Sequence, residues 1–211
     1  MKQDYTHIVL IADRSGSMSA SQGEAQAAIN TFIKDQAAQP GNCTLSLAQF
    51  DNEYDLIHDF AVINDVPKYQ LEPRGMTALY DAVGLTIASV GLKLAQMQES
   101  DRPALVTVVI CTDGAENASK EYSQQRIAAM IKEQREVYHW KFIFLGVDIE
   151  AEQVAESIQI PVASAVKVSR RKGAAAYQVT SRKIAAARSA LATGKPAADI
   201  AYSADEKEEL G

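Results

Sequence analysis

A chain of 211 residues is long enough to bury the core of one α/β domain, with or without a small appendage. With 47% hydrophobic and 23% charged residues and only 11 glycines and 6 prolines, it excludes a disordered chain, a collagen-like repeat and a disulfide scaffold. Each of the two cysteines, Cys43 and Cys111, lies in an apolar run. This favours reduced, buried thiols over a disulfide or a zinc site.

The net charge of −6 is unevenly distributed along the chain. Residues 1–166 carry 12 basic and 22 acidic residues, 167–195 carry eight basic and no acidic ones, and 196–211 carry one basic and five acidic ones. We therefore expect a single domain over residues 1–195, followed by an acidic C-terminal tail over 196–211. No apolar run approaches the ~18 residues of a membrane span and no signal peptide is visible, so we expect a cytoplasmic protein without a membrane partner.

The first part of the chain predicts a buried strand followed by a helix. Residues 6–12 form an apolar run that ends in a polar cluster at 13–17, as a strand buried on both faces does where it meets a loop. Apolar residues at helical spacing then predict a helix from about 21 to 38, and Ser21 and Glu24 match the capping-box pattern at its start.

The remaining elements complete an α/β pattern. A strand is expected at 43–50, and because residues 51–53 are too few for a crossover, the strand at 54–63 should return antiparallel to it. Further patterns predict helices at 78–97, 122–137, 151–157 and 174–192, and strands at 104–111, 140–147 and 163–168. This alternation predicts a doubly wound, mostly parallel six-stranded sheet with one antiparallel strand and helices on both faces.

Chemistry is expected where two apolar strands each end in an aspartate. Asp13 and Asp113 follow the runs at 6–12 and 104–111, and ligands of such sheets bind at the carboxyl ends of the strands. Asp13, Ser15 and Ser17 alternate, so three oxygens can face one way. Oxygen donors with few charges suit a hard cation, with Mg²⁺ favoured and Mn²⁺ or Ca²⁺ as alternatives.

These residues resemble the motifs of von Willebrand factor A (VWA) domains. Residues 13–17 match the family's DxSxS pattern, Thr77 stands just before a long helix as in its second motif, and Asp113 closes a strand as in its third. The resemblance covers roughly residues 5–192. It implies strand order 3-2-1-4-5-6 and a metal-ion-dependent adhesion site (MIDAS) that would be formed by Asp13, Ser15, Ser17, Thr77 and Asp113.

The resemblance implies a binding module, not an enzyme. The bound metal would capture an acidic residue of a partner protein, and the loops at 49–53, 72–76 and 115–120 would supply specificity. The family also implies movement of the final helix coupled to Thr77. The chain is similar to stand-alone intracellular members of bacteria and their viruses, some of which work beside AAA+ ATPases, so such an ATPase is one partner to test.

Several interpretations stay open beside this one. Asp81 and Asn117 fit both a role in orienting the ligands and a plain surface position. The main rival function is a metal-dependent phosphohydrolase with Asp13 as nucleophile, although Ser15 stands where such enzymes carry a second acid.

Two further kinds of site are disfavoured by the sequence. Nucleic-acid binding would use the basic residues of the segment 167–195. These residues fit better as a solvated helix face or as a docking surface for the acidic tail. They are Lys167, Arg170, Arg171, Lys172, Arg182, Lys183, Arg188 and Lys195. The three histidines, His7, His58 and His139, share no ligand spacing and are expected at the surface or within strands.

Overall fold

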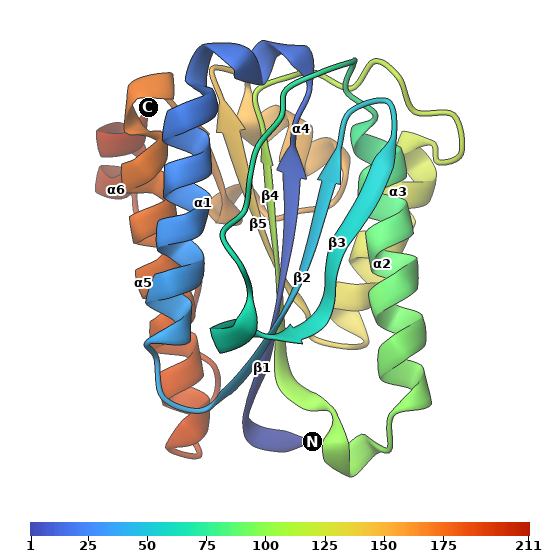
Figure 1. Ribbon diagram of the computed structural model, residues 1–211. Coiled ribbons are helices and arrows are strands. Elements are labelled where there is room, and N and C mark those ends of the chain that lie inside the picture. The colour runs from blue at the N-terminus through green and yellow to red at the C-terminus, as the bar shows by residue number, and fades with distance from the viewer.

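The computed structural model describes residues 1–211 as a six-stranded sheet with helices on both faces (Figure 1). The strand order is β3-β2-β1-β4-β5-β6, and every neighbouring pair is parallel except β2 and β3. This confirms the predicted fold class. The strands are β1 (Lys2–Asp13), β2 (Asn42–Phe50), β3 (Tyr54–Val62), β4 (Pro103–Thr112), β5 (Lys141–Val147) and β6 (Ala165–Val168).

Two hydrophobic layers separate the sheet from its helices. One layer packs against α1 and α5 and the other against α2, α3 and α4, as Figure 1 shows for the helices on either side of the sheet. None of the helices combines the length and the apolar character that crossing a membrane requires. The helices are α1 (Gln22–Ala37), α2 (Leu79–Gln96), α3 (Gln124–Glu136), α4 (Ala151–Ser157), α5 (Gly173–Ala192) and α6 (Ala204–Leu210).

Strand β1 is central because its apolar run serves both layers. Ile8 and Leu10 belong to the α1/α5 layer, whereas Val9 and Ile11 belong to the layer under α2 and α3. All four side chains are at most 2% exposed. A strand covered on both faces has no polar positions, which is why the sequence shows a continuous apolar run instead of alternation.

The start of α1 differs from the prediction. A 3-10 helix, η1 (Gly16–Ser21), runs directly into α1, and Ser21 makes no side-chain capping hydrogen bond. The expected capping box of Ser21 and Glu24 is therefore wrong, because the preceding turn leaves no free helix start to cap.

The segment expected as an acidic tail contains a helix that packs on the domain. Ser203 and Glu206 form a capping box at the start of α6. Ile200, Tyr202 and Leu210 are buried in the α1/α5 layer. Five of the six charged residues of this segment are acidic, but Ile200, Tyr202 and Leu210 hold it along α5 and β6.

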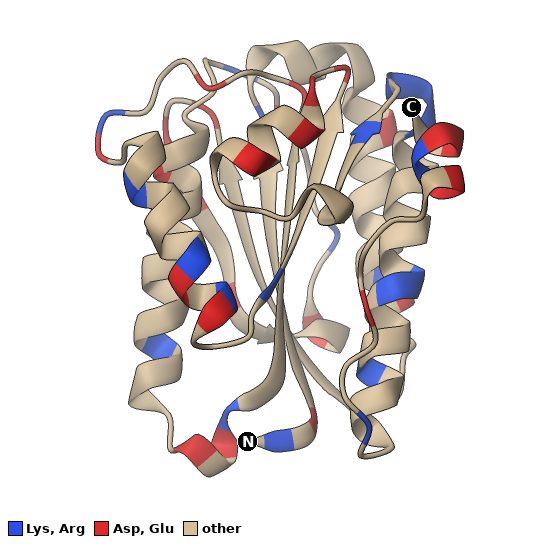
Figure 2. Ribbon diagram, turned by 180° about the vertical axis from the view of Figure 1, so that it is seen from behind, with Lys and Arg blue, Asp and Glu red and all other residues tan.

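The basic residues of 167–195 do not share one surface. Arg188 is buried, and Lys183 pairs with Glu206 of α6, their Nζ and Oε2 atoms being 2.7 Å apart. Figure 2 shows Lys and Arg spread over several elements and interleaved with Asp and Glu. Part of the basic segment thus forms a docking surface for the acidic segment, one of the two roles that the sequence left open beside a solvated helix face.

His7 is a buried residue of β1. Its Nδ1 lies 2.8 Å from Thr44 Oγ1, its ring stacks on Phe60, and its Nε2 has no hydrogen-bond partner. Burial, with a smaller contribution from Lys93, lowers the pKa of His7 to about 3. The folded protein therefore holds His7 neutral through the whole range in which an unfolded histidine gains its proton.

Acid is expected to destabilise the protein through His7. The unfolded chain takes up a proton at His7 near pH 6.5 and the folded chain only near pH 3. The free energy of unfolding is therefore highest above pH 6.5. It falls by about 2 kcal/mol between pH 6.5 and pH 5, because the unfolded chain binds a proton that the folded chain does not. Urea unfolding of the wild type and His7→Leu at several pH values measures this. If the free energies of unfolding of the wild type and of His7→Leu changed with pH by the same amount between pH 7.5 and pH 5, this role of His7 would be contradicted.

Candidate metal centre

The sheet brings the two motif aspartates to one edge. β1 and β4 are adjacent and parallel, with Ala12 opposite Cys111. Asp13 therefore ends β1 next to Thr112, the last residue of β4, and Asp113 follows Thr112 at the same edge of the sheet. Thr77 reaches the same edge from the loop before α2. Asp13 and Thr77 are 2% and 3% exposed, whereas Ser17 is exposed, so the site reaches the surface at Ser17.

Both oxygens of Asp13 are engaged. Oδ1 accepts the backbone N–H of Ser15 at 2.6 Å, and Oδ2 accepts the hydroxyl of Thr112. Burial raises the pKa of the Asp13 carboxyl and Asp113 raises it further, against the lowering effect of these hydrogen bonds. Asp13 therefore fixes the loop that follows β1 and adds buried negative charge that favours a nearby cation.

The alternating residues of the first loop turn their oxygens to one side. Ser15 Oγ and Ser17 Oγ are 3.1 Å apart, and Ser17 Oγ donates to Asp113 Oδ1 at 2.5 Å. Arg14, between Asp13 and Ser15 in the chain, points away toward Asp51 and Asp55. The structure thus places the two serine hydroxyls on one side, with Asp113 beside them and Arg14 on the other side.

Thr77 completes the cluster through close packing on the loop after β4. A Cβ atom on Gly114 would lie 2.7 Å from Thr77 Oγ1, so this hydroxyl rests against the residue that follows Asp113. Asn117 Oδ1 accepts the N–H of Thr77 at 2.9 Å, and the N–H of Asn117 donates to the carbonyl of Thr77 at 3.0 Å. Asn117 therefore orients Thr77, one of the two roles left open by the sequence.

Asp81 acts further from the cluster. Its carboxylate accepts the backbone N–H groups of Lys120, Glu121 and Tyr122 at 2.7, 2.9 and 2.8 Å. These bonds tie the loop after β4 to the first turn of α2. Asp81 thus shapes the rim of the site without facing the hydroxyls.

The donors gathered here suit a hard cation. No three His, Cys, Asp or Glu side chains lie close enough together to hold a metal ion. The cluster instead combines two carboxylates with the hydroxyls of Ser15, Ser17 and Thr77, all of them oxygen donors. Such a set fits Mg²⁺, which accepts one or two carboxylates with neutral oxygens and water.

Comparisons with solved structures identify the fold. Proximal thread matrix protein 1 from the mussel byssus superimposes with a TM-score of 0.62 at 16% identity, over 84% of this chain and 45% of that one. The vWF domain of the type V pili tip protein Mfa5 from Porphyromonas gingivalis gives 0.62 at 11% identity, over 85% and 94%. The chain has the von Willebrand factor A fold.

Among the comparisons with known proteins, only the structural ones give matches. A von Willebrand factor type A structure from Catenulispora acidiphila also matches, with a TM-score of 0.55, 11% identity and coverage of 85% of this chain and 42% of that one. The chain spans under half the length of the mussel and Catenulispora proteins. No protein-family model matches it, and no curated protein does.

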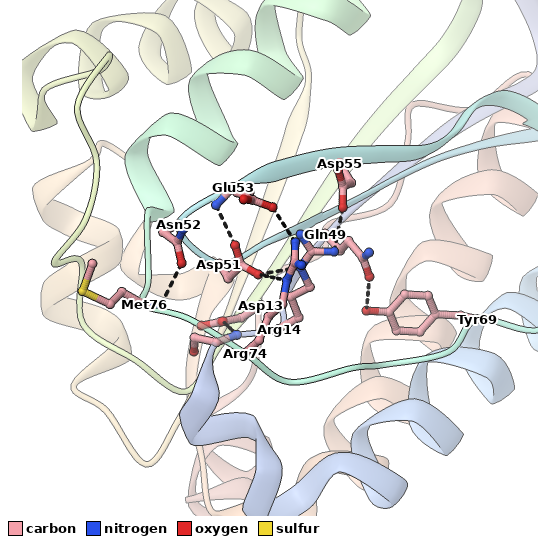
Figure 3. A network of polar contacts seen from close by, with 11 residues as sticks. Asp13, Arg14, Gln49, Asp51, Asn52, Glu53, Asp55, Tyr69, Arg74 and Met76 are labelled. Carbon is pink, nitrogen blue, oxygen red and sulfur yellow. Dashed lines mark hydrogen bonds and ion pairs between the residues drawn. The ribbon is translucent and has the colours of Figure 1, made fainter.

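The sequence did not indicate how the loops of the site are held together. Figure 3 shows Asp51, in the turn between β2 and β3, at the centre of a polar network. Its Oδ2 accepts Arg14 Nε at 2.9 Å and Arg74 Nε at 2.7 Å, and its Oδ1 accepts the N–H of Glu53 at 2.6 Å. Its carbonyl accepts the N–H of Ala78 at 2.8 Å. One residue, 1% exposed, thereby ties three loops of the site.

Backbone contacts support the same arrangement. The N–H of Gly16 donates to the carbonyl of Gly75 at 3.1 Å, and the N–H of Arg74 donates to the carbonyl of Arg14 at 2.8 Å. Gly75 has a φ of +69°, and a Cβ there would collide with Asn52 Oδ1. Only glycine fits this position, so the loop before Thr77 depends on it.

Arg170 is the second residue that sequence reasoning missed at the site. It opens the 3-10 helix η5 (Arg170–Lys172), which leads into α5. Its Nη2 lies 3.5 Å from Asp113 Oδ2, and its Nε lies 3.2 Å from Asp148 Oδ2. A guanidinium group thus faces the oxygen of Asp113 that Ser17 does not use.

Proposed function

We propose that this chain is a binding module that holds a divalent cation, Mg²⁺ by preference, and uses it to capture a carboxylate of a partner protein. The observation that carries the proposal is the convergence of Ser15, Ser17, Thr77 and two aspartates, from three separate loops, at the carboxyl edge of β1 and β4. A hydroxyl-rich edge between two buried carboxylates has no evident role in packing, whereas it matches the donors of a hard cation.

The position of each residue indicates its role toward the ion. The hydroxyls of Ser15, Ser17 and Thr77 would hold the ion, and Asp113 would act beside Ser17, whose proton it accepts. Asp13 would act through the loop, since both of its oxygens are engaged. When bound, the ion would supply positive charge little offset by its ligands, which favours an incoming carboxylate.

Similar structures support the metal and the binding role. One structure of the mussel byssus protein has a zinc-occupied MIDAS motif, with a TM-score of 0.59 and 15% identity over 83% of this chain and 46% of that one. Other matches are a pili tip protein and a pilus adhesin. These proteins are matrix or adhesion proteins by description, which supports a non-enzymatic module here. Mn²⁺, Ca²⁺ and Zn²⁺ remain ions to compare with Mg²⁺.

Titration of metal-free protein with Mg²⁺ and Mn²⁺ tests the site. We expect Asp13→Ala and Thr77→Ala to bind either ion at least about tenfold more weakly than the wild type, because each removes a ligand or its support. Thr193→Ala, at the exposed end of α5, is the matched control and should bind like the wild type. Equal binding by all four proteins, or no binding by folded wild type, would refute the site.

The geometry of Asp13 argues against the rival phosphohydrolase. A nucleophilic carboxylate needs an oxygen free to attack, whereas Asp13 is 2% exposed and both of its oxygens accept hydrogen bonds. Phosphatase activity that disappears in Asp13→Asn would favour the enzyme instead.

The partner and the compartment form the last part of the proposal. We infer a partner with an exposed acidic residue, and an AAA+ ATPase of the same cell is the first candidate for co-purification in Mg²⁺ and in EDTA. Cys43 and Cys111 are free and buried, and burial raises their thiol pKa values to about 11 and about 12. Two unpaired thiols support a reducing compartment such as the cytoplasm.

A further inference from the structure

The metal edge carries a positive side chain of its own. Among all salt bridges of the protein, the one to Arg170 is the only one that reaches Asp13 or Asp113. The Asp113 side chain is fully buried, whereas that of Arg170 is 34% exposed. Arg170 therefore approaches from the solvent side, the side from which an ion would enter.

The position of Arg170 is built by a second carboxylate. Asp148 lies just after β5. Its Oδ1 accepts the backbone N–H of Arg170 at 3.2 Å, and its Oδ2 lies 3.2 Å from Arg170 Nε. Asp148 itself has a φ of +54°, and its N–H donates to the carbonyl of Val168 at 2.9 Å. The guanidinium thus has one anchor at Asp148 and one at Asp113, and it can release the second while keeping the first.

The charge balance of the edge explains what this contact does. Asp13 and Asp113 are two buried carboxylates that leave adjacent strands, and their mutual repulsion is unfavourable without a nearby cation. Arg170 supplies positive charge at Asp113 Oδ2, whereas Ser17 donates to Oδ1. A divalent ion among the hydroxyls would supply the same compensation and would repel the guanidinium.

We propose that Arg170 is a built-in counter-cation that competes with the metal ion for Asp113. In metal-free protein it neutralises Asp113, and on metal binding it withdraws toward Asp148, which moves η5 at the start of α5. This inference rests on the proposed metal site. Arg170 acts as a positioning residue that lowers the affinity for the ion and links its binding to η5.

Calorimetric Mg²⁺ titration of Arg170→Gln against the wild type tests the competition. We expect about three- to tenfold tighter binding in Arg170→Gln, because the ion no longer displaces or faces a guanidinium. Arg171→Gln is the matched control, since Arg171 is exposed on the same turn and makes no salt bridge or side-chain hydrogen bond. It should bind like the wild type.

Hydrogen exchange supplies a readout that simple charge removal would not move. In the wild type, saturating Mg²⁺ should increase exchange at residues 169–172, and in Arg170→Gln this metal-dependent increase should be absent. Equal Mg²⁺ affinity of all three proteins, or the same exchange response in each, overturns the role of Arg170 and leaves the metal site standing. Absence of Mg²⁺ binding in every folded protein overturns the metal site, and the competition with it.

Discussion

Asp51→Ala is expected to lower the free energy of unfolding by about 3–5 kcal/mol. The substitution would leave Arg14, 5% exposed, without the acceptor of its Nε and would also remove the acceptor of the Glu53 N–H. Breaking a buried ion pair from one side is costly because the remaining charge stays out of water, and here only the half-exposed Asp55 would still compensate it. Urea unfolding at neutral pH, followed by circular dichroism, measures the loss.

Asp55→Ala is the matched control, since it removes the other carboxylate that binds Arg14. Asp55 Oδ2 lies 2.6 Å from Arg14 Nη1, but the Asp55 side chain is 51% exposed. Arg14 lowers the pKa of this carboxyl, yet water screens the pair, so a loss of about 1 kcal/mol or less is expected. Similar losses for Asp51→Ala and Asp55→Ala would show that burial of the first pair does not set its contribution.

The network around Asp51 also explains why the metal loops keep their shape. The Asp51 carboxylate binds Arg14 from the first loop and Arg74 from the second, so its loss frees both loops, whereas the bond from Ala78 to the backbone carbonyl of residue 51 stays. The same variant should therefore bind Mg²⁺ more weakly even where it remains folded. Stability and metal binding depend here on one buried carboxylate.

Most of the fold was predictable because its signals are local. The apolar runs at residues 6–12 and 104–111 mark strands covered on both faces, and the three-residue turn at 51–53 identifies the antiparallel pair. The core of the site followed from the same logic. Alternation in residues 13–17 predicted that hydroxyls and Arg14 would face opposite ways, as they do.

The missed features depend on contacts between distant residues. Asp51 lies 37 residues from Arg14 and 23 from Arg74, and Arg170 lies 57 from Asp113. No local pattern distinguishes these residues from ordinary charged loop positions. The docking of α6 was hidden for another reason, since acidic residues outnumber the three apolar ones that attach it.

Arg188 is the case in which composition misled most. The sequence placed it in a basic, solvated segment, yet it is 5% exposed and hydrogen-bonds to Gln36 and Pro40 instead of forming a salt bridge. Its Nη1 donates to the carbonyl and to Oε1 of Gln36 at 2.7 and 3.0 Å, and Gln36 Nε2 donates to Ser181 Oγ at 2.8 Å. The acceptors lie in the last turn of α1, where carbonyl groups carry partial negative charge.

Arg188→Ala is therefore expected to destabilise the protein by about 2–4 kcal/mol, because it leaves buried Gln36 acceptors unpaired and opens a cavity between α1 and α5. Arg182→Ala removes an exposed arginine from the same helix and should change the free energy of unfolding by less than about 0.5 kcal/mol. Urea unfolding of both variants measures the difference. If the two losses were equal, the contacts of Arg188 with Gln36 would not be what holds α5 against α1.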